Sequence, residues 1–364
     1  MSARRLLLTF ALAFSLGVLA TVFLLQRPAQ QAQIVADAPA NAEAPKADSS
    51  AKADPGEADS PDRDGGTPAK ADTDSSPDAD WPADAGSPEQ LLYAQAQMMD
   101  TAVAALAPRT PGRPNIYLIA FAGDGGENVF RNEAEYAEKL FSERFDAVGH
   151  TLLLINNPST LLQYPIATLS NLQTAVNAVA ERMDGEQDIL MLFLTSHGSR
   201  EHELYVALDP LPLDQIEPDD LADLFLDTKV HNKVVVISAC YSGGFIDALK
   251  GPATMVITAA RADRTSFGCG TQSAITDFGR AFLANGLNDN DSFPAAFAEA
   301  RKLVERWETR AGEEHSEPQI ATTPLIESRL KAWRDAIHPG PPVPFNTARP
   351  HRQSNGTRAL TAAR

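Results

Sequence analysis

VVVISACYSGG, residues Val234–Gly244, is the stretch that indicates the fold class of this 364-residue chain. Four consecutive β-branched residues followed by small ones are typical of a buried strand in a parallel sheet. The two glycines supply a tight exit into a helix that residues Phe245–Leu249 predict. Cys240 therefore falls at the carboxyl end of a central strand, where open α/β sheets place ligands and chemistry. A helix that begins there lowers the pKa of a thiol, although a lone cysteine at a strand end is also compatible with a buried, unreactive residue.

A second apolar strand, upstream of the first, ends in a histidine. Residues 188–196, DILMLFLTS, are followed by His197 and Gly198. Because parallel strands end at the same edge of a sheet, His197 and Cys240 are expected to meet there. A neutral imidazole can take the thiol proton and later give it to a leaving amine, while the thiolate attacks a carbonyl carbon. Gly198 has no side chain in the way, so its backbone N–H can face the oxyanion that forms.

Three segments carry a resemblance to a known family. They are Thr195–Ser199 (TSHGS), Ile237–Gly244 (ISACYSGG) and Ile257–Cys269 (ITAARADRTSFGC). In these segments the chain resembles the legumain-like (asparaginyl endopeptidase) cysteine peptidases, which belong to the wider group that includes the caspases. The resemblance covers roughly residues 115–322. It implies an α/β fold, a caspase-like three-layer sandwich with a central, mostly parallel sheet flanked by helices.

The resemblance also implies roles for individual residues. His197 would be the general base and acid, Cys240 the nucleophile, and the backbone N–H groups of Gly198 and Cys240 the oxyanion donors. Such an enzyme cleaves protein or peptide substrates through an acyl-thioester and needs no cofactor and no metal. Some relatives in the wider group transfer acyl groups to amines, so a transamidase is the alternative enzyme. A non-catalytic, membrane-anchored binding scaffold that kept the fold is the alternative from another class.

Three residues are candidates for binding substrate. Arg131 falls where legumain-like enzymes carry a pocket arginine, although a solvated arginine at a helix start would look the same in the sequence. Asp263 and Ser266 lie in the polar segment after the next strand, which helps to line the site in the resembling family. The family pattern breaks at Tyr241 and Arg280, where those enzymes carry acids. Cleavage after asparagine is therefore not implied.

Several other motifs are compatible with structural or chemical roles. Cys269, the second of two cysteines, is interpreted as a structural free thiol near the cleft, with a redox role or pairing with Cys240 as the alternative. Residues 123–128, GDGGEN, lack the spacing of a phosphate-binding loop and carry two acids, which favours a pocket-forming loop. Residues 201–203, EHE, lack a helical metal-ligand spacing and indicate a surface turn. Ser242 lacks the first glycine of a serine nucleophile elbow, which disfavours a serine hydrolase.

Composition divides the chain into one folded domain with appendages. Residues 1–27 contain an uncharged apolar run long enough to span a bilayer, Leu6–Leu25, and predict a membrane anchor or a cleaved signal segment. Residues 28–88 are rich in Ala, Asp and Pro and poor in large apolar residues, so we expect a disordered linker. Residues 89–325 are predicted to form the peptidase domain. Residues 326–364 predict a C-terminal helix and a disordered tail.

The distribution of charge indicates the location and the partners of the protein. Arg4 and Arg5 precede the apolar run and an acidic segment follows it, so the positive-inside rule leaves the N-terminus in the cytoplasm. The domain is then expected in the periplasm, anchored at the inner membrane, or free in the periplasm if the segment is cleaved. The formal net charge of −17 argues against nucleic-acid binding. The sequence does not indicate an oligomeric state.

Overall fold

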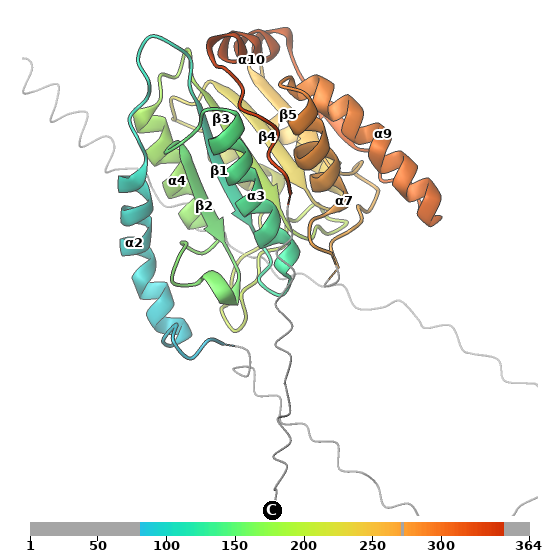
Figure 1. Ribbon diagram of the computed structural model, residues 1–364. Coiled ribbons are helices and arrows are strands. Elements are labelled where there is room, and N and C mark those ends of the chain that lie inside the picture. The colour runs from blue at the N-terminus through green and yellow to red at the C-terminus, as the bar shows by residue number, and fades with distance from the viewer. Residues whose placement is uncertain (1–80, 271–272, 346–364) are drawn as a thin grey trace, which may run out of the picture. The chain divides into compact units, whose positions relative to one another are not determined.

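The computed structural model describes residues 81–270 and 273–345, so the predicted membrane segment and most of the predicted linker lie outside the described residues (Figure 1). The described chain forms a six-stranded sheet with the strand order β2-β1-β3-β4-β5-β6. Strands β1 to β5 pair in parallel, and β6 joins the edge antiparallel to β5. No helix in the described ranges is both long and apolar enough to cross a membrane. The strands are β1 (Ile116–Ala122), β2 (Thr151–Ile155), β3 (Ile189–Thr195), β4 (Asn232–Ser238), β5 (Thr254–Thr258) and β6 (Gln319–Ala321).

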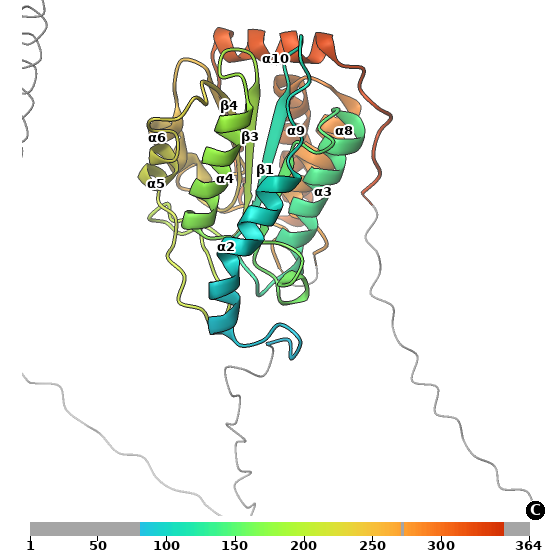
Figure 2. The ribbon, with the colours of Figure 1, turned by 90° about the vertical axis from the view of Figure 1, so that its left-hand side faces the viewer.

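Helices cover both faces of the sheet and make three layers (Figure 2). Side chains of α3, α9 and α10 form a core with one face, and side chains of α4, α5 and α6 form a core with the other. A π-helical turn, Arg280–Gly286, joins α7 to α8. The helices are α2 (Pro88–Ala105), α3 (Asn128–Arg144), α4 (Leu169–Arg182), α5 (Pro218–Asp223), α6 (Ile246–Leu249), α7 (Asp277–Gly279), α8 (Leu287–Asp289), α9 (Phe293–Ala311) and α10 (Pro324–Ala336).

The central strands are buried on both of their faces. Every residue of β1 and β3 is buried. In β3, Met191 and Phe193 contribute to the core that includes α3, whereas Leu190 and Leu192 contribute to the core that includes α4. Because successive side chains of a strand point to opposite faces, a strand between two helical layers needs a continuous apolar run. The structure confirms the predicted α/β architecture, with a mostly parallel sheet flanked by helices.

The C-terminal helix α10 is part of the folded core, although the sequence pattern places the domain boundary before it. Ile326 and Trp333 are 0% and 1% exposed, and both lie in the same core cluster as residues of α3 and α9. Beyond the helix, Val343 is also buried, and its backbone exchanges two hydrogen bonds of 2.8 Å with the side chain of Asn288. The start of the predicted disordered tail is therefore held by packing and by hydrogen bonds to segments distant in the sequence.

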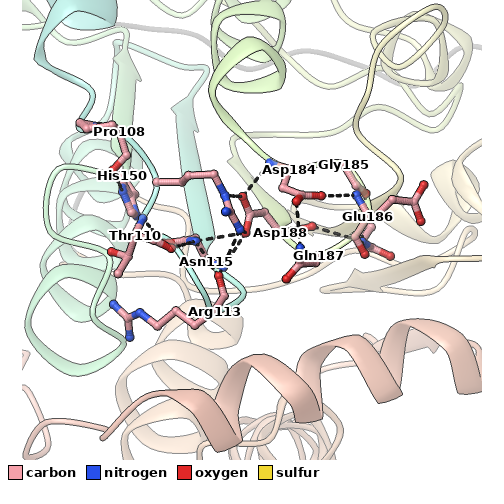
Figure 3. Close-up of polar contacts among 12 residues, drawn as sticks. Pro108, Thr110, Arg113, Asn115, His150, Asp184, Gly185, Glu186, Gln187 and Asp188 are labelled. Carbon is pink, nitrogen blue, oxygen red and sulfur yellow. Dashed lines mark hydrogen bonds and ion pairs between the residues drawn. The ribbon is translucent and has the colours of Figure 1, made fainter.

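A polar network at the amino-terminal edge of the sheet surrounds Asp188, the residue before β3 (Figure 3). Its carboxylate is fully buried and accepts two hydrogen bonds from Arg109, at 2.9 and 3.0 Å. The backbone N–H groups of Asn115 and Asp184 donate to the same carboxylate at 2.8 and 2.7 Å. Burial opposes the ionisation of Asp188, but these donors outweigh it and lower the pKa of the carboxyl group. The network thus ties the segment before β1 to the turn before β3.

Replacing Asp188 with asparagine should destabilise the fold, because the guanidinium of Arg109 would lose its charged partner. We expect the free energy of unfolding to fall by about 2–3 kcal/mol at neutral pH in urea titrations. A carboxyl group whose pKa is lowered by folding stabilises the protein above its unfolded pKa and loses that contribution as the pH falls through the folded value. Acidification below about pH 4 should therefore destabilise Asp188→Asn less than the wild type. Asp100→Asn, at an exposed position of α2, is the control, and equal effects of the two substitutions would contradict the prediction.

Candidate active site

Parallel pairing of β3 with β4 brings His197 and Cys240 to one edge of the sheet. Thr195 lies opposite Ser238 in the register of the two strands. His197 and Cys240 each lie two positions further along the chain. The two turns are in close contact, because a Cβ atom on Gly198 would lie 2.1 Å from the carbonyl oxygen of Cys240. Only glycine fits at position 198.

The chain turns sharply after Cys240 and packs against the segment that follows β5. Tyr241 adopts a left-handed conformation with φ of 54°, and its backbone N–H donates to the carbonyl of Arg264 at 2.7 Å. The helix predicted to follow is short, since a 3₁₀ turn at Ser242–Phe245 leads into only four residues of α6. A thiolate at position 240 therefore needs a source of stabilisation other than a long helix.

Groups that favour a thiolate surround the partly buried thiol of Cys240. The largest effect comes from the neighbouring thiol of Cys269. The backbone N–H of Ser266 donates to Sγ at 3.3 Å, the Ser266 hydroxyl lies 3.7 Å away, and a positive charge on His197 acts in the same direction. Burial opposes these groups without cancelling them, so the pKa of the Cys240 thiol is lowered to about 6. The interaction between the two thiols raises the pKa of the Cys269 thiol, and both cysteines are free of disulfides.

Two carboxylates flank the imidazole of His197. Its Nε2 lies 3.6 Å from Oδ2 of Asp124 and 3.5 Å from Oε2 of Glu127. That oxygen of Glu127 is buried and has no hydrogen-bond partner in the described part of the chain. The ring of Phe130 packs edge-on against the imidazole, with 5.1 Å between the centroids. Both acids come from the loop between β1 and α3. The sequence predicts this segment as a pocket-forming loop but does not link it to His197. The signal for that link was the presence of two acids at the carboxyl end of a third parallel strand.

The backbone N–H groups of Gly198 and Cys240 have no backbone acceptor within the described residues. Residues 197–199 and 203–205 form a short antiparallel contact. Its hydrogen bonds run from the N–H of Ser199 to the carbonyl of Glu203 and from the N–H of Tyr205 to the carbonyl of His197, so the N–H of Gly198 takes no part in it. Both N–H groups are therefore available to a ligand atom at this edge of the sheet.

Of the three candidates for substrate binding, Ser266 contacts the thiol described above. Asp263 is exposed and forms an ion pair with Arg261. Arg131, at the start of α3, donates a hydrogen bond of 3.3 Å to the side chain of Asn157 in the loop after β2. Asp263 and Arg131 are therefore engaged by other side chains of the protein itself.

Two further polar side chains brace the turn that follows β4. The buried hydroxyl of Ser242 donates to the carbonyl of Ala239 at 2.7 Å and accepts from the N–H of Ala260 at 3.2 Å. Nδ1 of His202 lies 3.2 Å from the carbonyl oxygen of Tyr241. These contacts give Ser242 and His202 structural roles, and the structure shows no cluster of three or more metal-ligating side chains across residues 81–270 and 273–345.

Comparison with known proteins identifies a family that part of this chain resembles. Residues 167–328 match the model of the Peptidase C13 family. This range includes β3 and β4, together with His197 after the first strand and Cys240 after the second. The comparison with curated proteins found no match. Among solved structures, the crystal structure of caspase-1 from Spodoptera frugiperda is similar, with a TM-score of 0.40 and 15% identity over 58% of this chain and 86% of that chain. The family match confirms the resemblance to legumain-like enzymes that the sequence motifs predict, and it supports a function of the cysteine-peptidase type.

Proposed function

We propose that the chain is a cysteine endopeptidase that hydrolyses peptide bonds with His197 and Cys240 as a catalytic dyad. The observation that carries the proposal is the environment of the thiol, whose pKa is lowered at the same sheet edge that carries His197. A thiolate present near neutral pH is the nucleophile that such a reaction needs. The match to a peptidase family supports a peptide bond as the substrate.

In the first half of the proposed reaction, the sulfur of Cys240 forms a bond to the carbonyl carbon of the peptide. His197 holds the proton of the thiol, while the N–H groups of Gly198 and Cys240 donate to the oxyanion. As the carbon–nitrogen bond breaks, His197 gives its proton to the leaving amine and an acyl-thioester remains. In the second half, water gives a proton to His197 and its oxygen attacks the thioester carbon. The carbon–sulfur bond then breaks, which releases the carboxylic acid and restores the thiolate.

Asp124 and Glu127 act through His197 in this proposal. Their carboxylates lie 3.6 and 3.5 Å from Nε2, so their negative charges favour a proton on that nitrogen. The groups beside one imidazole nitrogen decide which tautomer is present. With a proton held on Nε2, the other nitrogen, Nδ1, is free to exchange a proton with Cys240. The two acids are therefore positioning residues for the imidazole ring.

Ser266 is the proposed substrate contact, because it lies beside the sulfur that the peptide must reach. A substrate bound by Arg131 or Asp263 would compete with the present partners of Arg131, which include Asn157 and Ser159, and with Arg261, the partner of Asp263. We propose these two as contacts for polar groups of the peptide on either side of the cleaved bond.

We expect the rate at which iodoacetamide labels Cys240 to rise with pH and to reach half of its maximum near pH 6, well below the midpoint of an ordinary thiol. Mass spectrometry of the labelled full-length chain assigns the modified cysteine. His197→Ala should raise the midpoint and slow the labelling at pH 7, because the positive charge beside the sulfur is lost. His231→Ala, an exposed histidine that pairs with Glu186, is the matched control and should leave the labelling unchanged.

Peptide hydrolysis completes this test. A fluorogenic peptide library with a varied residue before the cleaved bond should be turned over by the wild type, and Cys240→Ala should lose at least about 10³-fold in kcat. Added amine distinguishes hydrolysis from transamidation, because a transamidase joins the acyl group to the amine. If no peptide is cleaved and Cys240 labels no faster than a free thiol, the non-catalytic binding scaffold becomes the better description.

Removing the thiol of Cys269 should raise the pKa of Cys240, because this thiol is the neighbour that lowers the pKa most. We expect the midpoint of alkylation to rise by about one pH unit in Cys269→Ala, equivalent to about 1.4 kcal/mol. Cys269→Ser keeps a donor at this position and should remain closer to the wild type. An unchanged midpoint in Cys269→Ala would show instead that Ser266 and His197 lower the pKa without it.

The proposed location is the periplasmic face of the inner membrane, with Leu6–Leu25 as the anchor. The support is the length of this uncharged run and the presence of Arg4 and Arg5 before it, all outside the described residues. The full-length chain should stay with the membrane fraction after a carbonate wash, and added protease should digest it in spheroplasts. A soluble periplasmic product that lacks the N-terminal residues would indicate a cleaved signal segment, whereas protection in spheroplasts would contradict the location.

A further inference from the structure

A buried carboxyl group lies next to the two strand ends that carry His197 and Cys240. Glu133 belongs to α3, and its side chain is 0% exposed. Its Oε2 lies 3.1 Å from the hydroxyl of Thr195 on β3, and its Oε1 accepts a hydrogen bond of 3.1 Å from the hydroxyl of Thr276. The proposed reaction does not use this group, so its burial needs another explanation.

A chain of hydroxyl groups extends from Glu133 to β4. The hydroxyl of Thr276 lies 3.1 Å from that of Ser238 on β4, and it accepts the N–H of Gly279 at 2.8 Å as the cap of α7. One carboxyl group therefore connects α3, β3, β4 and α7. Thr195 and Ser238 lie opposite each other in the sheet, two positions before the residues of the dyad. A shift of Glu133 would thus act on both strand ends at once.

The surroundings of Glu133 favour its neutral form. A Cβ atom on Gly279 would lie 2.0 Å from Oε1, so the backbone of the neighbouring helix packs directly against the carboxyl group. None of the ion pairs within the described ranges includes Glu133. Burial raises the pKa of Glu133 to about 7, and hydrogen bonds from Ser238, Thr195 and Thr276 offset only part of this effect.

We propose that Glu133 is a positioning residue, which in its neutral form holds the ends of β3 and β4 in the arrangement that the reaction needs. This inference rests on the proposed function of His197 and Cys240. The hydroxyls of Thr195 and Thr276 both donate to the carboxyl group, and its neutral form accepts these two hydrogen bonds without placing a charge in the core. A carboxylate has only acceptors, and it would be a buried charge without a cation. Ionisation of Glu133 should therefore loosen both strand ends and lower kcat as the pH rises.

Other titratable groups face the same region, so a pH profile of the wild type alone does not isolate Glu133. Those of the dyad, of α3, of α7 and of the π-helical turn that follows it are present whatever the residue at position 133. The ratio of kcat values between two chains that differ only at position 133 therefore largely cancels the contributions of these other groups. The groups concerned are His197, Cys240, Asp277, Arg280, Arg131 and Glu135.

The test measures kcat and KM of the full-length wild type and of Glu133→Gln across the pH range. Glutamine resembles the neutral acid in shape and both donates and accepts, but it does not titrate. The ratio of kcat in Glu133→Gln to kcat in the wild type should rise about tenfold between pH 6 and pH 8, with little change in KM. Glu143→Gln, at an exposed position of the same helix, should give a flat ratio. A flat ratio for Glu133→Gln as well, or a folded Glu133→Gln that is inactive at every pH, would overturn the proposal.

Thermal unfolding provides a readout that is independent of peptide hydrolysis. Folding raises the pKa of Glu133, so the wild type loses stability as the pH rises from the ordinary value of a glutamate to about 7. The thermal midpoint of Glu133→Gln relative to the wild type should therefore increase between pH 5 and pH 7.5. A constant difference would contradict the titration of Glu133 and with it the proposal.

Thr195 allows a matched test of the geometry. Thr195→Val removes the hydroxyl that faces Glu133 and should lower kcat about tenfold with little change in KM, whereas Thr195→Ser should restore it. Iodoacetamide labelling of Cys240 at pH 7 should follow the same order, because a displaced His197 stabilises the thiolate less. If the wild type cleaves no peptide, the peptidase function fails while the labelling still tests the positioning role. Equal labelling of the two Thr195 variants would overturn that role alone.

Discussion

The structure depends on the parallel pairing of β3 with β4, in which Thr195 lies opposite Ser238. Both strands are almost wholly buried, so a shift of one residue in their register would turn each side chain toward the wrong helical layer and would separate His197 from Cys240. The contact between the backbone of Gly198 and the turn after β4 leaves no space for such a shift. The same ladder of hydrogen bonds therefore sets both the core and the geometry of the site.

Two buried carboxyl groups near opposite ends of β3 show how their partners decide their charge. Asp188 precedes the strand and is held by the guanidinium of Arg109 and by backbone N–H groups, so its pKa is lowered. Glu133 lies at the other end among hydroxyl groups, and burial raises its pKa to about 7. The first group forms a fixed ion pair away from the dyad. The second changes its protonation state near neutral pH, next to the strand ends that carry the reactive side chains.

Local sequence patterns predicted the elements of the fold better than the contacts between distant segments. The apolar runs that end in His197 and Cys240 predicted both strands and their common edge. The position of Asp124 and Glu127 beside His197 was not predicted, because it depends on the pairing of β1 with β3, which brings a loop from another strand to the imidazole. Glu133 carries no local signal either, since a glutamate on an amphipathic helix ordinarily faces solvent and only tertiary packing buries it.

Two glycines at the site differ in what surrounds them, and this difference bears on how the sequence can change during evolution. A Cβ atom at position 198 would collide with a backbone carbonyl, which cannot move without breaking the turn. At position 279 the obstacle is the side chain of Glu133, which a different residue would remove. Position 198 therefore admits only glycine whatever its neighbours are. Position 279 accepts a larger residue once position 133 carries a shorter one, so among homologous chains these two positions should vary as a pair.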